Sequence, residues 1–353
     1  MSRKIRAIIN FRVSHVVILF FMALPFNSCN KDDNGVTDQF GEVLYSDGFC
    51  SPIEVHWLPC NNEILSIDDC GRLYRINVET KSKILLKNFY TDYNHLYQKG
   101  FYSEELPEKL IYVALVIDPL SGSYDFFKIF VFDLEEKESE LLIDESFDLD
   151  FSLQVQLLMG HLNLAILHQE ELIIIDIVTK EKKYLPISDR PVAFSPDDDK
   201  ILLYQVDHTL VFGAYIYDFS CNCQYPFDMQ VYGQPFWREE GMFGFYYHSN
   251  GVAYYNLATG ELFSWFDSFP MGHNIANHGT LLITMIRNQN IQNPKVDFIS
   301  IDFTSGEQRI IKTIDYNPIL SQLYGLSISN DQKKLTYIHN YPGQNEIRLI
   351  PIE

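Results

Sequence analysis

The stretch that decides the fold is Pro191-Val192-Ala193-Phe194-Ser195-Pro196-Asp197-Asp198-Asp199-Lys200-Ile201-Leu202-Leu203-Tyr204. Residues 191–194 form one apolar strand pattern before Ser195-Pro196-Asp197, and residues 201–204 form a second one after Lys200. Proline fixes φ and aspartate caps a turn, so the centre predicts a hairpin turn between two strands. Weaker copies of the stretch occur at residues 235–245 and 326–337. Recurrence at this scale indicates a repeat protein.

A second recurring sequence feature is a short apolar strand pattern that ends in aspartate or asparagine. It repeats at intervals of roughly 40 to 55 residues, the length of a unit of about four strands. A polar turn of the Ala-Thr-Gly-Glu type follows several copies, which predicts a tight hairpin before the next strand. The residues that end these strand patterns are Asn77, Asp133, Asp176, Asp218, Asn256 and Asp302.

The quoted copies resemble the Ser-Pro-Asp-Gly-Lys repeat of TolB-like, WD-type β-propellers. The resemblance covers residues 42–353, although only three units carry the sharp motif. It implies an all-β fold consisting of a single β-propeller, with seven blades favoured and six or eight left open. The last unit has three strand patterns, so residues 40–45 are expected to supply its fourth and close the ring. A pair of packed open sheets is the alternative.

The N-terminal segment is expected to be a targeting signal. A basic start and a short apolar run precede Cys29, an arrangement that resembles a bacterial lipoprotein signal peptide over residues 1–28. Cys29 would then be the lipidated first residue of the mature chain. Phe26 and Asn27 depart from the usual pattern before the cysteine, so a plain secretory signal or a signal anchor is the alternative.

The residues after Cys29 sharpen this expectation. Asn30-Lys31-Asp32-Asp33 is similar to the surface-export signal of Bacteroidetes-type lipoproteins, and residues 29–41 would form a polar tether. We therefore expect a protein held at the outer membrane or cell surface of a Gram-negative bacterium. The lipid is its only expected membrane contact.

The charge balance excludes other classes of partner. The chain has 47 acidic and 27 basic side chains, which gives a formal charge of −20. Nucleic acids select basic surfaces, so no nucleic-acid partner is expected. Anionic lipid headgroups would also repel such a protein. Aromatic residues make up 14% of the chain, which favours strands.

Five cysteines remain after Cys29, so at least one is unpaired within the chain. Cys60 falls in the turn between the first two expected strands, at the end opposite Cys50 and Cys70. A six-residue strand spans about 20 Å, beyond the reach of a disulfide. Cys50–Cys70 is therefore the expected bridge, with reduced thiols as the alternative. Cys221-Asn222-Cys223 lacks the spacing of a zinc knuckle, and no metal site is expected there.

Histidines recur at the ends of expected second strands. His168, His208 and His248 are spaced by about 40 residues, the repeat period, and His339 and Arg287 hold the matching places in later units. If these side chains share one face of a propeller, they would form a site for acid–base chemistry or a divalent metal. Solvated or turn-capping histidines are the alternative.

Residues 88–108 are expected to be an insertion that overhangs the same face. Its tyrosines are candidate ligand-binding residues because stacked aromatic rings suit sugars and peptides. A loop that packs on its own blade is the alternative. The candidates are Tyr90, Tyr93, Tyr97 and Tyr102.

The standard signatures of serine hydrolases, zincins and nucleotide-binding enzymes are absent from the sequence. We therefore expect a non-catalytic module that binds a glycan, a peptide or a partner protein in the envelope, without a cofactor. The alternative is a propeller-fold polysaccharide lyase or glycan hydrolase that uses the histidine-rich face, where a divalent metal would assist. A structural role in an envelope assembly is a third hypothesis.

Overall fold

The computed structural model describes residues 40–352, apart from 92–94, 104, 118–123, 144–146, 149–155, 169–170, 208–209, 228–230, 240–241, 248–250, 257–258, 260, 265–274, 279, 288–293, 303–304, 306 and 317–320. These residues belong to the second of two units, Asp38–Glu353. They form antiparallel strands and one short 3-10 helix, η1 (Phe89–Thr91). In the described part of the chain, no helix is long and apolar enough to span a bilayer.

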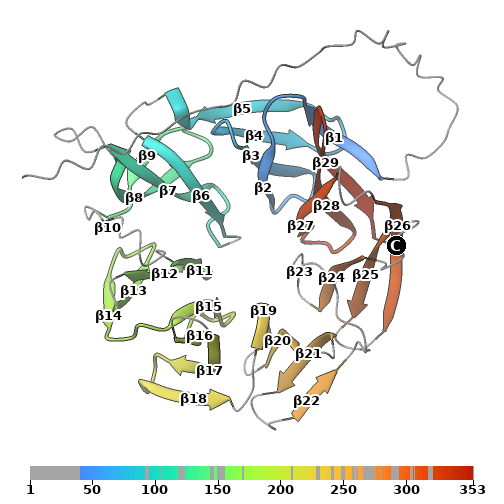
Figure 1. Ribbon diagram of the computed structural model, residues 1–353. Coiled ribbons are helices and arrows are strands. Elements are labelled where there is room, and N and C mark those ends of the chain that lie inside the picture. The colour runs from blue at the N-terminus through green and yellow to red at the C-terminus, as the bar shows by residue number, and fades with distance from the viewer. Residues whose placement is uncertain are drawn as a thin grey trace, which may run out of the picture. The chain divides into compact units, whose positions relative to one another are not determined.

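The described strands form seven sheets, which follow one another in chain order (Figure 1). The first sheet consists of β2 (Pro52–Trp57), β3 (Glu63–Asp68), β4 (Arg72–Asn77) and β5 (Lys83–Asn88). The second consists of β6 (His95–Tyr102), β7 (Lys109–Ile117), β8 (Tyr124–Asp133) and β10 (Phe147–Asp148), with β9 (Ser139–Leu141) also on β8. The third consists of β11 (Gln156–Met159), β12 (Asn163–His168), β13 (Glu171–Asp176) and β14 (Lys182–Leu185).

The remaining four sheets repeat this order. The fourth consists of β15 (Arg190–Phe194), β16 (Lys200–Asp207), β17 (Leu210–Asp218) and β18 (Cys223–Phe227). The fifth consists of β19 (Val231–Glu239), β20 (Met242–Tyr247), β21 (Gly251–Asn256) and β22 (Glu261–Ser264). The sixth consists of β23 (Ile275–His278), β24 (Leu281–Arg287), β25 (Lys295–Asp302) and β26 (Gln308–Asp315). The seventh consists of β27 (Gln322–Ile328), β28 (Lys334–Tyr341), β29 (Gln344–Pro351) and β1 (Glu42–Asp47).

The N-terminal strand closes the fold, as the sequence predicts. β1 pairs antiparallel with β29, so the outermost strand of the last sheet comes from the start of the fold. Arg348 of β29 strengthens this closure, since its Nη1 donates to the Gly41 carbonyl at 2.9 Å and its Nε to Glu346 at 2.6 Å. Both partners of this ion pair are buried.

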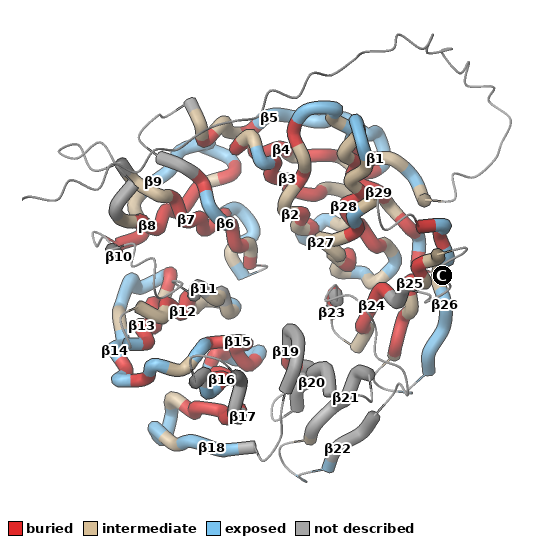
Figure 2. The backbone as a smooth tube through the Cα atoms, in the orientation of Figure 1, coloured by how far each residue is buried: buried red, intermediate tan, exposed pale blue. Residues whose placement is uncertain are grey.

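Buried residues run along the strands of the sheets (Figure 2). The core lies between neighbouring sheets, where alternate side chains of one strand serve two interfaces. On β7, Leu110 and Tyr112 pack against the first sheet. Ile111 and Val113, on the opposite face of the same strand, pack against the third. A strand buried on both faces needs a continuous apolar run, which explains the Leu-Ile-Tyr-Val-Ala-Leu-Val-Ile sequence of β7.

The aspartates and asparagines that end strand patterns build the outer hairpins. The Asp176 carboxylate accepts hydrogen bonds from the N–H groups of Val178 and Thr179, at 2.9 and 2.7 Å. The residue four positions after several of these caps has a left-handed backbone, as at Lys180 with φ of 61°. A turn followed by a left-handed residue is a standard hairpin connection. The same capping bond occurs at Asn77, Asp133, Asp218, Asn256 and Asp302.

The fold-deciding motif builds the turn between the first two strands of its sheet. The Ser195 hydroxyl donates to Asp197 Oδ1 at 2.5 Å, and Ser329 donates to Asp331 in the equivalent turn at 2.6 Å. Burial alone would raise the pKa of Asp197, but the hydrogen bonds from Ser195 and the Asp199 N–H, together with the charge of Lys200, outweigh it, and the pKa is lowered. The motif is therefore a structural element of the blade.

One expectation about residues 88–108 is wrong. This segment contains η1 and β6, and β6 is an end strand of the second sheet. It is not an insertion that overhangs a face. The segment forms a strand because aromatic residues favour β structure. Two of them, Tyr97 and Phe101, are buried and pack in the core.

Candidate functional site

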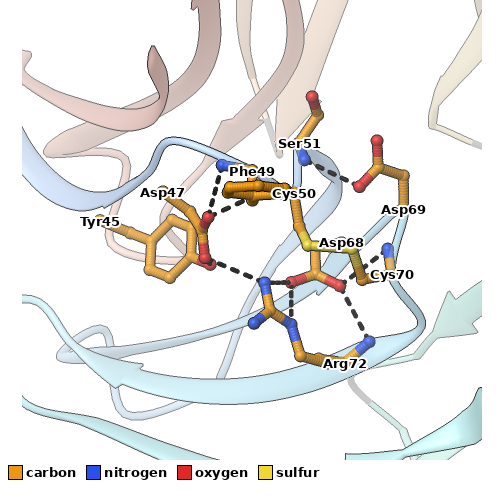
Figure 3. Close-up of a disulfide and its surroundings, with 9 residues drawn as sticks. All are labelled: Tyr45, Asp47, Phe49, Cys50, Ser51, Asp68, Asp69, Cys70 and Arg72. Carbon is orange, nitrogen blue, oxygen red and sulfur yellow. Dashed lines mark hydrogen bonds and ion pairs between the residues drawn. A yellow bond between two sulfur atoms is a disulfide. The ribbon is translucent and has the colours of Figure 1, made fainter. Parts of the chain in front are cut away.

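The site is built from two connections that the disulfide joins (Figure 3). One connection runs from β1 to β2, from the closing strand of the seventh sheet into the first sheet. The other is the turn between β3 and β4. Cys50 and Cys70 are bonded across them with Cα atoms 5.7 Å apart, and Cys60 is free and exposed. This is the pairing that the strand geometry predicts.

An ion-pair network runs beside the disulfide. Arg72 Nη2 lies 2.9 Å from Asp47 Oδ2 and 2.7 Å from Asp68 Oδ2. Asp68 is buried and also accepts hydrogen bonds from the N–H groups of Cys70 and Arg72. Burial alone would lower the pKa of Arg72, but its two carboxylate partners outweigh it and raise that pKa. The guanidinium therefore ties the end of β1 to the turn of the first sheet.

Asp47 shapes the β1–β2 connection. Its Oδ1 accepts hydrogen bonds from the N–H groups of Phe49 and Cys50, at 2.8 and 3.1 Å. Burial alone would raise the pKa of Asp47, but these two bonds and the contact with Arg72 lower it to about 2. Phe49 is held at the tip of this turn with 96% of its surface exposed.

Asp69 completes the connection between the two loops. Its Oδ1 accepts the N–H of Ser51 at 2.8 Å, and its own N–H donates to the Ser51 carbonyl at 2.9 Å. Ligand atoms of Cys50, Asp69 and Cys70 lie within 4.8 Å of one another. Because the two sulfurs are bonded to each other, this group is a loop clamp and does not provide thiolates for a metal. We call residues 47–51 and 68–72 the closure loops.

The candidate tyrosines have different environments. The Tyr90 ring packs on the β3–β4 turn, where a Cβ on Gly71 would lie 2.8 Å from Tyr90 Cδ1. Gly71 also has φ of +70°, so this position requires glycine. Tyr97 is buried and cannot reach a ligand at the surface, whereas Tyr102 is half-buried and its hydroxyl donates to the Pro107 carbonyl at 3.2 Å. Tyr93 lies outside the described residues.

Sequence reasoning missed a polar cluster between β2 and β6. Glu54 Oε2 accepts the Tyr97 hydroxyl at 2.6 Å and the Gly100 N–H at 3.1 Å. His56 Nε2 lies 3.7 Å from the same oxygen. Burial raises the pKa of Tyr97, and the Glu54 charge and hydrogen bond raise it further. The alternation of Glu54 and His56 in a strand pattern was the available signal, since both point to one face.

Two of the predicted histidines, His168 and His339, are among the described residues. His168 ends β12, as predicted, and packs edge-on against Phe147 with ring centroids 5.5 Å apart. His339 does not end its strand, because β28 continues to Tyr341, and its side chain is 3% exposed between Phe40 and Tyr341. Its place in the strand interior explains this burial.

The other predicted site residues lie outside the described residues or are described by their backbone alone. His208 and His248 lie outside the described residues. Arg287 ends β24, paired with Val296, and only its backbone position is described. Cys29 also lies outside the described residues. The sulfurs of Cys221 and Cys223 are bonded to each other.

A cavity of about 360 Å³ lies away from these residues. It is bounded by β26, the end of β29 and the residue that precedes β1. Its lining combines two basic side chains with isoleucines, and contains none of the candidate site residues. The lining residues are Gly41, Arg309, Ile310, Ile311, Lys312, Ile350 and Pro351.

Comparisons with known proteins agree with this fold. No protein-family model matches the sequence, and a search of curated proteins gives no significant match. Oligogalacturonate lyase from Vibrio parahaemolyticus has a TM-score of 0.60 at 13% identity, over 88% of this chain and 93% of that chain. The fold is a β-propeller. At this identity the likeness shows the architecture alone.

Two other solved structures are similar over most of this chain. TolB from Acinetobacter baumannii has a TM-score of 0.45 at 12% identity, over 79% of this chain and 65% of that chain, less than two thirds of its length. PorZ, a surface component of the type-IX secretion system of Porphyromonas gingivalis, has a TM-score of 0.56 at 12% identity. That alignment covers 89% of this chain and 39% of PorZ.

Proposed function

We propose that this protein is a lipid-anchored β-propeller in the envelope or on the surface of a Gram-negative bacterium. There it acts as a non-catalytic binding module for a partner protein, a peptide or a glycan. The observation that carries the proposal is the constraint on the closure loops, which a disulfide, an ion-pair network and backbone hydrogen bonds hold together. Loops fixed on a rigid scaffold are a common form of binding surface.

Three of the described acid–base groups are held inside the fold, which favours binding over catalysis at those positions. A general acid or base has to reach the substrate within hydrogen-bond distance. Glu54 is occupied by Tyr97 and Gly100, Asp68 is buried against Arg72, and His339 is buried inside its sheet. Among the described residues these polar groups hold the fold together.

The anchor rests on the sequence around Cys29. A basic start, an apolar run and a following Lys-Asp-Asp together favour lipidation and export to the surface. The test compares the natural chain with Cys29→Ser by labelling cells with a fatty-acid analogue, and then treating intact cells with protease. We expect labelling and surface cleavage of the natural chain only. An unlabelled natural chain would refute the anchor.

The binding role is tested with the full Cys29→Ser chain in solution. We expect it to bind a component of one of two panels, host and plant glycans or the outer-membrane proteins of the producing bacterium. Cys50→Ser/Cys70→Ser should bind more weakly because the closure loops lose their constraint, whereas Cys60→Ser should bind like the parent. Absence of binding to both panels would overturn the proposal.

The alternative function is a polysaccharide lyase or glycan hydrolase that uses His168, His208, His248 and Arg287. The fold likeness to oligogalacturonate lyase is its support, and the burial of His339 counts against that residue's part in it. The same chain is incubated with oligogalacturonates and other glycans, with and without Mn²⁺. Turnover that His168→Ala abolishes would favour the enzyme over the binding module.

A further inference from the structure

Phe49 is exposed to an extent that no packing reason explains. It has 96% of its surface in solvent, while the next most exposed large apolar side chains of the described residues, Val178 and Ile310, reach 60%. Single exposed apolar residues are common on protein surfaces. Phe49 differs because the chain on both sides of it is constrained, at Asp47 and at Cys50.

The constraint begins at the backbone on both sides of Phe49. Its own N–H donates to Asp47 at 2.8 Å, and the next residue, Cys50, is bonded to Cys70. Arg72 holds the Asp47 carboxylate from the other side at 2.9 Å. The phenyl ring is therefore presented from a backbone that loses little entropy when a partner binds. Rigid, exposed aromatic side chains are a typical anchor of protein interfaces.

The charge next to the ring defines the partner. Asp47 is partly exposed beside it and is paired with Arg72. Asp69 on the facing loop is exposed, and its carboxylate accepts the Ser51 N–H. The whole chain carries a formal charge of −20. A second copy of the chain or an anionic lipid surface would meet like charge, whereas a basic rim would be complementary.

We propose that the closure loops are a protein-docking surface, and that Phe49 inserts into an apolar pocket with a basic rim on a partner protein. The inference deepens the proposed binding function and rests on it. Asp69 orients the partner by charge, and the disulfide keeps Phe49 in its binding position. Phe49 is therefore a binding anchor that contributes nothing to the stability of the fold.

The first experiment locates the contact in cells. A photo-reactive benzoylphenylalanine replaces Phe49 in the full chain, and separately replaces Lys99, an exposed residue of β6. After irradiation of intact cells, mass spectrometry identifies the adducts. We expect one protein adduct from position 49. An adduct from position 99 alone would overturn the docking surface and leave the binding function standing, and adducts from neither position would count against both.

The second experiment measures the affinity of the full chain for the purified adduct protein. Phe49→Ala should weaken binding by about 30-fold, the usual size of an anchor effect. It should leave the thermal midpoint unchanged, because the side chain is almost fully exposed. Tyr225→Ala, which removes a half-exposed ring from β18, is the matched control and should bind like the parent.

Charge and disulfide variants complete the test. Asp69→Asn should weaken binding at low salt and lose its effect at high salt, because screening removes the charge contribution. Cys50→Ser/Cys70→Ser should weaken binding less than Phe49→Ala. Binding of Phe49→Ala within twofold of the parent would overturn the proposal. So would an adduct of the chain with itself, or binding to phosphatidylglycerol vesicles that Phe49→Ala abolishes.

Discussion

Asp198 provides a strong test of how neighbouring sheets are joined. It belongs to the β15–β16 turn of the fourth sheet, and its buried carboxylate accepts three backbone N–H groups from the β11–β12 turn and the start of β12, and also the Asn163 side-chain amide at 3.3 Å. The donors are His161 at 2.9 Å, Leu162 at 2.7 Å and Asn163 at 2.9 Å. A Cβ on Gly160 would lie 2.2 Å from Asp198 Oδ1, so this approach requires glycine.

Asp198→Ala removes the acceptor and leaves these donors without it. A hydrogen bond to a charged group contributes about 1.5 to 3 kcal/mol, and three bonds to one group are not additive. We expect the free energy of unfolding to fall by about 3 to 5 kcal/mol. With a urea m-value of about 3 kcal/mol/M, the midpoint should fall by about 1 to 1.7 M.

The assay is urea unfolding followed by tryptophan fluorescence, with two further variants. Asp199→Ala removes an exposed neighbouring carboxylate and should change the free energy of unfolding by less than about 0.5 kcal/mol. Asp198→Asn tolerates the left-handed backbone of this position, φ of 56°, and should lie between the parent and alanine. A loss for Asp198→Ala no larger than that of Asp199→Ala would refute the reasoning.

Three further predictions concern the closure of the fold. Cys50→Ser/Cys70→Ser should lower the free energy of unfolding by about 3 kcal/mol, the loop-entropy value for the separation of 20 residues, with Cys60→Ser unchanged in the same urea titration. Trp57→Phe should cost about 1 to 3 kcal/mol in thermal or urea unfolding, since the Trp57 Nε1 donates to the Ser327 carbonyl at 3.1 Å across the first and seventh sheets. Because the folded pKa of Asp47 is about 2, below its ordinary 3.8, its contribution is present at neutral pH and is lost as pH falls from 3.8 towards 2. The stability gap between the parent and Asp47→Asn should therefore close over that interval, and a gap that is constant from pH 6 to pH 2 would contradict the assignment.

Local patterns in the sequence predicted those features whose contacts are local. The Ser195–Asp197 bond joins residues two positions apart, and the cap at Asp176 reaches only Val178 and Thr179. Turns of this kind depend on side chains that bond to nearby backbone, so the residue types identify them. The closing strand followed from the shortage of one strand in the last unit, and the Cys50–Cys70 pairing followed from strand length.

Local reasoning failed where a residue's role depends on the neighbouring sheet. Residues 88–108 have the composition of an aromatic loop, yet the first and third sheets bury Tyr97 and Phe101 in two separate clusters. His339 was expected at the end of its strand, but β28 continues to Tyr341 and the packing of Phe40 against the imidazole makes it a core residue. Neither outcome is encoded in the few residues around the side chain.

The sequence by itself determined the class of fold, the period of the repeat and the hairpin turns. Only the tertiary structure decided which groups meet between sheets: Trp57 with Ser327, Asp198 with the β11–β12 turn, and Glu54 with Tyr97. The physical reason is the distance along the sequence over which each interaction acts. Alternation and turn capping act within a few residues, whereas contacts between sheets depend on how whole strands pack against one another.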